Sequence, residues 1–208
     1  MSFAKNVFVN CPFDTDYLPL LRPLLFTITY LGLTPRIAVE TLNSGQARIT
    51  KLIDLMCESK FAVHDLSRLK AKVVGEIYRM NMPFELGVDI GCQLFKAGKW
   101  TKKKCLILEA EKYAYQAAIS DLSNSDIAVH KNEPLEVVTQ VRNWLNNELD
   151  LDAPGPSAIW GAFNDFMAAD YVALAAKKFS PADIAKLPIE ELRKRMAKWV
   201  KTVSVPKS

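Results

Sequence analysis

Short apolar segments alternate with segments of helical periodicity from the start of the chain to about residue 149. The apolar segments are rich in β-branched residues, which is typical of strands buried on both faces of a sheet. Strands that alternate with helices form parallel sheets with right-handed crossovers and helices on both faces. The sequence therefore predicts an α/β fold with a doubly wound parallel sheet of about five strands, at Asn6–Val9, Leu33–Val39, Lys60–Asp65, Cys105–Leu108 and Ile127–Val129.

The segments between these strands carry apolar residues at helical spacing. The first runs from Leu18 to Gly32, and the glycine is expected to end the helix. Pro19 and Pro23 fit only an early helical turn, so the sequence leaves the start of this helix open. Residues 66–82 form a long, basic connection with poor periodicity. Further helices are predicted at residues 48–59, 83–95, 113–119 and 134–149.

A different pattern follows residue 150. Residues 150–157 (DLDAPGPS) have the composition of a linker. Beyond them we expect three helices. The first covers residues 159–179, the second begins after an N-cap at Ser180, and the third runs from Pro188 to about Thr202. The sequence thus predicts an α/β domain over residues 1–150 and a small helical appendage over 151–208. The appendage's aromatic residues are expected to pack against the main domain rather than to form a binding surface: Trp160, Phe163, Phe166 and Tyr171.

The net charge of +4 comes largely from residues 96–104 and the tail beyond Arg193. The run Lys102–Lys104 is interpreted as the solvated start of a strand, with a phosphate or nucleic-acid surface as the alternative. No zinc-finger spacing, RNA-binding aromatic signature or glycine-rich phosphate loop supports that alternative, so no nucleic-acid partner is expected.

The four cysteines form no CxxC pair, and only His64 and His130 are present as further soft ligands. Neither a metal site nor a disulfide framework is expected. Three of the cysteines lie in apolar contexts and are interpreted as small core residues: Cys57, Cys92 and Cys105. Cys11 lies in a loop and is a candidate for exposure.

Every apolar run is interrupted well before the length that a membrane span requires. The first residues, MSFAKNVFVN, lack a basic segment that leads into an apolar stretch of signal length. We therefore expect a cytoplasmic protein without a membrane partner.

Ligands of open parallel sheets bind at the carboxyl ends of the strands, where the chain switches direction. Three predicted loops lie there, at residues 10–16, 40–46 and 66–82. The strongest single segment follows the last of them and reads NMPFELGVDIG from Asn81 to Gly91. Pro83 fits a first helical turn, which places Glu85 in that turn.

Two interpretations of this segment stay open. In the simpler one, Glu85 interacts with the helix dipole and caps free N–H groups. Gly87 and Gly91 lie four residues apart on one face and are expected to let the helix backbone approach the sheet closely. Two glycines cost about 1 kcal/mol each against alanine in a helix, so close packing is expected to compensate.

The ordered motifs FAVHDLS, NMPFELGVDIGCQLF and KCLILE resemble a signature of nucleoside 2-deoxyribosyltransferase-like proteins. TIR-related proteins share the same flavodoxin-like layout, with a glutamate at the start of the corresponding helix. The resemblance covers roughly residues 5–130. It implies that Glu85 is the catalytic carboxylate and that Asp65 is a neighbouring polar group.

Both families break an N-glycosidic bond to a ribose. The transition state resembles an oxocarbenium ion, so a carboxylate below the sugar stabilises the positive charge or attacks to form a glycosyl-enzyme intermediate. The resemblance therefore implies cleavage or transfer at such a bond in a nucleotide or nucleoside. NAD is the first expected substrate, and no separate cofactor is expected.

The resemblance also assigns substrate contacts. The loop after the first strand, with Asn10, Pro12, Phe13 and Asp14, would contact the nucleoside or nicotinamide side. Asp14 is otherwise a turn or capping residue, and Asn81 is either a ribose ligand or an N-cap. Arg36 and Arg48 would hold a phosphate, although each alone is as typical of a protein surface.

Two further functions remain open at this stage. The same cleft would serve a module that senses a nucleotide without cleaving it. TIR-like domains also act by self-association, which implies a homo-oligomer or a partner protein. For prokaryotic TIR-related proteins, the family implies a role in anti-phage defence.

Overall fold

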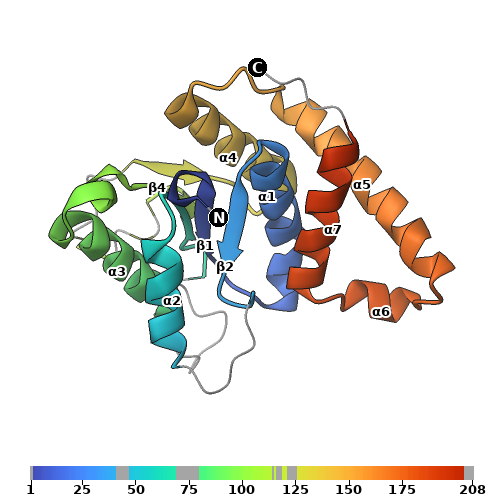
Figure 1. Cartoon of the computed structure of the whole chain (residues 1–208), viewed down its shortest axis with the longest axis horizontal. Helices are drawn as coiled ribbons and strands as arrows, with labels where there is room; N and C mark the ends of the chain where they lie inside the picture. Colours follow the sequence, from blue (N-terminus) through green and yellow to red (C-terminus); the bar gives the residue numbers. More distant parts are fainter. Residues whose placement is uncertain are drawn as a thin grey trace.

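The computed structural model describes residues 2–40, 47–68, 80–113, 115, 119–120 and 126–203. Within these residues, strands and helices alternate along the chain as the sequence predicts (Figure 1). Most of the predicted loop at 40–46, of the connection at 66–82 and of the helix at 113–119 lies outside the described residues. No helix in the described part is both long and apolar enough to span a membrane.

Among the described residues, five parallel strands form one sheet in the order β2-β1-β3-β4-β5. The register pairs Asn10 at the end of β1 with His64 of β3, and Asp65 with Leu108 of β4. The carboxyl ends of these strands therefore meet at one edge. The strand order confirms the predicted doubly wound fold. The strands are β1 (Asn6–Asn10), β2 (Thr34–Ile37), β3 (Phe61–Asp65), β4 (Lys104–Glu109) and β5 (Ile127–Val129).

Side chains of β1 alternate between two apolar cores, because successive strand residues point to opposite faces. Val7 and Val9 belong to the core formed with α1 (Leu18–Tyr30) and α4 (Pro134–Leu149). Phe8 packs instead with α2 (Arg48–Cys57), which lies beside α3 (Asn81–Phe95) on the other face. Burial on both faces explains why the strand is apolar throughout.

The C-terminal helices continue the α1–α4 core. α5 (Pro156–Ala176) contacts both α1 and α4, and α7 (Ile189–Thr202) contacts α1, with the short α6 (Pro181–Ala185) between them (Figure 1). The ring of Phe26 in α1 lies 5.5 Å from Phe163 and 5.7 Å from both Phe166 and Trp199. The predicted packing of the aromatic residues is thus confirmed for Phe163 and Phe166. It is wrong for Tyr171, which is 46% exposed.

Capping follows the predicted pattern at α6. Ser180 is the N-cap, and its hydroxyl accepts a hydrogen bond from the backbone N–H of Asp183 at 3.2 Å. The Asp183 carboxylate accepts from the Ser180 N–H at 2.9 Å, which completes a capping box.

The starts of two other helices differ from the sequence prediction. α1 begins at Leu18, so Pro19 lies in its first turn and Pro23 lies inside the helix. α3 begins at Asn81 rather than Pro83, with Met80 as the N-cap residue. Pro83 still lies in the first turn, where a backbone N–H has no intrahelical acceptor. Glu85 consequently lies two residues further into the helix than predicted, beyond its first turn, and the interpretation that it caps the helix is wrong.

The two glycines of α3 do not approach the sheet. Gly87 is exposed, and a Cβ atom built there meets no described atom within 4 Å. At Gly91, the closest contact would be 3.7 Å, to the side chain of Phe95. The predicted close packing against the sheet is therefore wrong, because both residues lie on the outer side of the helix.

Alanine in place of Gly87 is expected to stabilise the protein by about 0.5–1 kcal/mol, because it reduces the entropy of the unfolded chain without a steric cost. The change in the midpoint of urea unfolding measures this effect. Gly32→Ala is the matched control and should destabilise, since Gly32 has a φ of 77°. Equal effects of the two substitutions would contradict the prediction.

Candidate functional site

A cavity of about 420 Å³ lies at the carboxyl edge of the sheet, where β1 ends and α2 and α3 begin. This is the crevice in which open α/β sheets bind ligands. All of the residues predicted for the site except Arg36 and Asp65 line it: Asn10, Pro12, Phe13, Asp14, Arg48, Asn81 and Glu85. The lining further includes Cys11, Val39 and Met82, which the sequence did not single out.

Glu85 is a buried carboxylate that contacts no counter-charge in the part of the chain that the structure describes. It is 6% exposed, and among the described residues it has no hydrogen-bond or ion-pair partner. Burial raises the pKa of Glu85 above its ordinary value, and the positive charge of Arg48 opposes the rise. A desolvated and unpaired carboxylate of this kind strongly favours a positive charge placed in the cavity.

Arg48 supplies a cation to the same cavity. It is the first residue of α2 and is exposed, and no described residue forms an ion pair with it. Arg36 has the opposite arrangement, because its guanidinium contacts Glu40 at 2.7 Å and Glu58 at 2.8 Å. Of the two arginines predicted to hold a phosphate, the structure therefore brings only Arg48 to the cavity.

The orientation of the Asn10 amide is fixed by its neighbours. Its Nδ2 group donates to the Met82 carbonyl oxygen at 2.9 Å and lies 3.0 Å from Nδ1 of His64. The opposite orientation would place two oxygen atoms in contact at Met82. Both amide hydrogens are thus used, and the Asn10 carbonyl oxygen has no partner among the described residues. A ligand in the cavity is therefore expected to offer a hydroxyl or N–H group to this oxygen.

Asn10 is the first residue of a buried polar network that continues through His64 and Asp89 to Lys103. Because Nδ1 of His64 accepts from Asn10, its Nε2 carries the proton and faces Asp89 at 3.3 Å. The Lys103 ammonium lies 2.9 Å from the other oxygen of Asp89 and donates to the carbonyl oxygens of Met56 and Ser59. Burial opposes ionisation of Asp89, but His64 and Lys103 hold its pKa below the ordinary value.

Asp65 lies inside the protein rather than in the cavity wall. The Tyr17 hydroxyl and the Ser67 backbone N–H donate to its carboxylate, and Nε2 of His130 lies 3.1 Å away. Burial alone would raise the pKa of Asp65, but these contacts lower it. Asp65 thus contacts residues of the three segments that follow β1, β3 and β5. Its effect on the cavity is to fix the positions of these segments.

The remaining predicted residues have mixed roles. Asp14 caps the short 3-10 helix Thr15–Tyr17 by accepting from the Tyr17 N–H at 3.0 Å, and it contacts Arg68 at 3.8 Å. Its turn role is therefore shown, although it also lines the cavity. Asn81 is exposed and is not an N-cap, since Met80 holds that position.

Cys11 was a candidate for exposure, but its side chain is buried, 3% exposed, where it lines the cavity. Burial raises the pKa of its thiol well above the ordinary value, and the charges of Asp65 and Glu85 raise it further. Cys11 therefore stays a neutral thiol at physiological pH, and it is not a candidate nucleophile.

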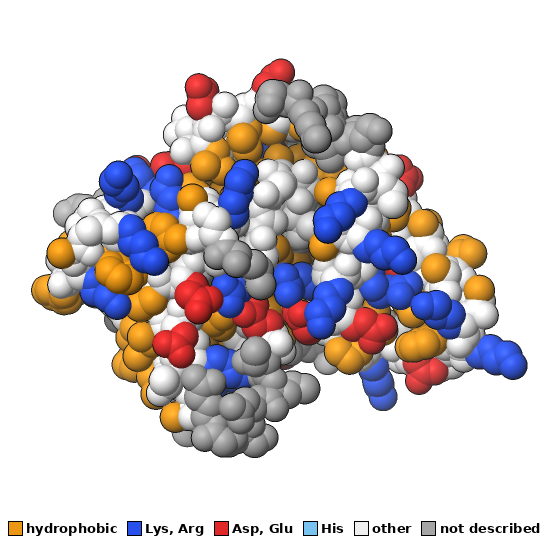
Figure 2. All heavy atoms as spheres, in the orientation of Figure 1, with side chains coloured by type: hydrophobic (Ala, Val, Ile, Leu, Met, Phe, Trp, Pro, Cys, Tyr) orange, Lys and Arg blue, Asp and Glu red, His pale blue; other side chains and the backbone are white. Residues whose placement is uncertain are grey.

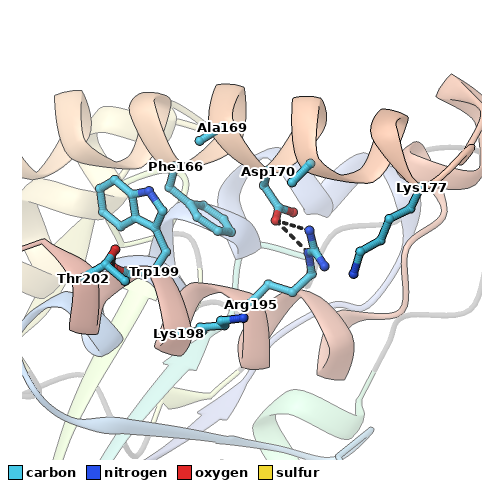
Figure 3. Close-up of a pocket in the computed structure, with 9 residues that line it drawn as sticks. Phe166, Ala169, Asp170, Lys177, Arg195, Lys198, Trp199 and Thr202 are labelled. Carbon is cyan, nitrogen blue, oxygen red and sulfur yellow. Dashed lines mark hydrogen bonds and ion pairs between the residues drawn. The ribbon is translucent and has the colours of Figure 1, made fainter.

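A second cavity, of about 400 Å³, lies between α5 and α7 (Figure 3). Its carboxylate, Asp170, forms an ion pair with Arg195 at 2.6 Å, and Lys177 and Lys198 lie at its margin (Figure 3). Its lining shares no residue with the cavity at Glu85 and holds no unpaired acid among the described residues. The cavity at Glu85 is therefore the better candidate for chemistry.

Within the described residues, no group of three or more side chains is arranged to hold a metal ion. No protein-family model, no curated protein and no solved structure matches the chain. The class that the fold and the cavity define is a doubly wound α/β protein with a cavity lined by a buried carboxylate at its topological switch point. The role of the site is inferred from its own side chains.

Proposed function

We propose that the chain cleaves, or transfers a group at, the N-glycosidic bond of a nucleotide or nucleoside, with Glu85 as the catalytic carboxylate. NAD is the first substrate to test. The observation that carries the proposal is a buried carboxylate, unpaired among the described residues, in the wall of a cavity at the carboxyl edge of the sheet. The doubly wound parallel sheet and the position of Glu85 near the start of α3 support the proposal.

The proposed hydrolysis of NAD needs no oxidant or reductant. The bond between C1′ of the ribose and the nicotinamide nitrogen breaks, and the bonding pair turns the pyridinium into neutral nicotinamide. Water adds to C1′ and loses a proton, which yields ADP-ribose. Glu85 would stabilise the positive charge at C1′ or attack that carbon to form an ester intermediate.

The other groups of the cavity suit a ribosyl phosphate. The free carbonyl oxygen of Asn10 would accept a hydrogen bond from a ribose hydroxyl, and the ring of Phe13 offers an apolar surface to a base. Arg48 would contact a phosphate. Asn81 lies one helical turn before Glu85 and would reach the same sugar.

The direct test is chromatography of NAD and deoxynucleosides after incubation with the purified full chain. Wild type should release nicotinamide or free base, whereas Glu85→Gln should reduce the rate on the order of 10²–10³-fold. Asp165→Asn is the control, because it removes an exposed carboxylate on α5. Identical product traces for wild type and Glu85→Gln at high enzyme concentration would rule out this catalytic role.

Arg48→Gln is expected to weaken binding of ADP-ribose about tenfold or more and to change the affinity for adenosine little, because a charge-assisted contact to phosphate contributes about 1.5–3 kcal/mol. Titration calorimetry measures both affinities. The matched control is Lys177→Gln, which removes a cation from the α5–α7 cavity. A loss caused by Lys177→Gln alone would place the ligand in that other cavity.

The raised pKa of Glu85 favours one alternative, a module that binds a nucleotide without cleaving it. A protonated Glu85 would donate a hydrogen bond to a ligand but would stabilise no cation. Calorimetry against NAD, ADP-ribose and cyclic nucleotides separates the two functions. Tight binding without any product would favour the sensor, and the absence of binding to all of them would remove both.

Exposed apolar side chains favour the self-association that TIR-like domains use. On α3, Phe84, Leu94 and Phe95 are 59%, 68% and 88% exposed, and Ile53 of α2 is 41% exposed. Figure 2 shows apolar side chains at the left and lower-left edge of the molecule, over α2 and α3. Light scattering tests this alternative, because a strict monomer at all concentrations, with or without ligand, would contradict it.

A further inference from the structure

Two cysteine thiols meet between the helices that form one wall of the cavity. Cys57 is the last residue of α2, and Cys92 lies in α3, which runs beside α2 (Figure 1). Their Sγ atoms are 3.7 Å apart, and both residues are free thiols. The separation is van der Waals contact, so the sulfur atoms need to approach by less than about 2 Å to reach the bond length of a disulfide.

We propose that Cys57 and Cys92 form a peroxide-sensitive dithiol, whose oxidation to a disulfide cross-links α2 to α3. The modification site lies outside the cavity and does not depend on which ligand the cavity binds. Sequence spacing gave no sign of it, because the two cysteines lie far apart along the chain and belong to no CxxC motif.

The surroundings of Cys57 suit the thiol that reacts first. Cys57 is partly exposed, and the Lys96 ammonium lies 3.4 Å from its sulfur. Lys96 also lies 4.2 Å from the centroid of the Trp100 ring, and the Trp100 indole donates to the Cys57 carbonyl oxygen at 3.0 Å. The ammonium is thus held beside the sulfur of the more exposed of the two thiols.

Cys92 suits the second step. It is 9% exposed, so peroxide reaches it less readily than it reaches Cys57. Burial and the neighbouring Cys57 raise the pKa of its thiol to about 11. Cys92 is therefore the thiol that resolves an oxidised Cys57, rather than the one that meets the oxidant.

The reaction balances with hydrogen peroxide as the oxidant. The Cys57 thiol gives up its proton as its sulfur attacks one peroxide oxygen, the O–O bond breaks, and the other oxygen leaves as water with that proton while Cys57 becomes a sulfenic acid. The Cys92 sulfur then attacks the Cys57 sulfur, the S–O bond breaks, and a second water leaves with the proton of Cys92. Two thiols and one peroxide thus give one disulfide and two waters.

The cross-link would fix the spacing of two helices that both begin at the cavity. Arg48 opens α2, and Asn81 and Glu85 lie in the first turns of α3, whereas the dithiol lies toward the other end of both helices. Oxidation would therefore hold these two helices together at the end away from the ligand.

The test uses the full chain, reduced, desalted and then exposed to excess hydrogen peroxide. After alkylation and trypsin digestion, mass spectrometry should show residues 52–60 (LIDLMCESK) linked to residues 80–96 (MNMPFELGVDIGCQLFK). Dithiothreitol should remove this species. The same oxidation should raise the thermal unfolding midpoint in a way that dithiothreitol reverses, because the bond restricts the unfolded chain.

Matched variants identify the two partners. Cys57→Ser and Cys92→Ser should each abolish the linked peptides, while Cys105→Ser should retain them. Full recovery of both peptides in alkylated form from peroxide-treated wild type would overturn the proposal. Linkage of either peptide to Cys11 or Cys105 would overturn it as well. Neither result bears on whether Glu85 cleaves a nucleotide.

Discussion

Methionine in place of Lys103 is expected to lower the free energy of unfolding by about 3–5 kcal/mol, because it leaves a buried carboxylate without its cation. Lys103 is 2% exposed, and its ammonium contacts Asp89 and the carbonyl oxygens of Met56 and Ser59. Methionine fills a similar volume but offers no donor to any of the three. Asp89, itself 3% exposed, would keep His64 as its sole polar contact among the described residues.

Urea unfolding at neutral pH measures this loss, and Lys104→Met is the matched control. Lys104 is the next residue and is exposed, with one contact to Glu148 at 3.7 Å. Its replacement should change stability by no more than about 0.5 kcal/mol. Similar effects of the two substitutions would show that Lys103 is not buried in an ion pair.

The double variant Lys103→Met with Asp89→Leu provides a second check. Removing both charges leaves no unpaired ion, so the double variant should be more stable than the sum of the two single losses predicts. The pH dependence has a definite sign. The pKa of Asp89 is lowered in the folded protein, so its contribution to stability is present at neutral pH and is lost as the pH falls through that lowered pKa.

Lys103 also shows where sequence patterns fail. The run Lys102–Lys104 is interpreted as a solvated segment, and this holds for the two outer lysines, which are exposed. The middle one is buried because it precedes β4 and points under α3 toward Asp89. Nothing local distinguishes it, since its partner lies in another helix.

The sheet and its carboxyl edge were predictable for a clear physical reason. Strands buried on both faces must be apolar throughout, and turn residues mark where they end. Asn10 therefore reached the cavity as predicted from its position after the first strand. The sheet topology brings Asn10 into the same cavity as Glu85, because β1 pairs with β3 and α3 follows β3 along the chain.

The supporting residues were not predictable from local sequence. His64 and His130 were considered only as metal ligands, whereas they fix Asn10 and Asp65, respectively. Arg36 and Arg48 are equally basic in sequence. Only tertiary contacts decide that Glu40 and Glu58 neutralise Arg36 and that Arg48 reaches the cavity.

Glu85→Gln is expected to have opposite effects on function and on stability. A carboxylate that stabilised the fold would have hydrogen bonds or a cation in contact, and Glu85 has neither among the described residues. Glutamine keeps the shape and removes the charge. The variant should therefore lose turnover by the factor given above and gain a few degrees in its thermal unfolding midpoint at neutral pH.

The pH dependence of that gain follows from the raised pKa of Glu85. Below the ordinary pKa of a glutamate, the side chain is protonated in both the folded and unfolded states, so wild type and Glu85→Gln should unfold at the same temperature. As the pH rises from that ordinary pKa to the raised folded-state pKa, the unfolded wild type ionises more readily than the folded protein, so the relative stability of wild type falls. The difference between the two unfolding midpoints should thus grow once the pH exceeds the ordinary pKa of a glutamate and level off above the raised folded-state pKa. A lower midpoint for Glu85→Gln at neutral pH would mean that the carboxylate has a stabilising partner, and an acid held in that way would not be free to face a sugar cation.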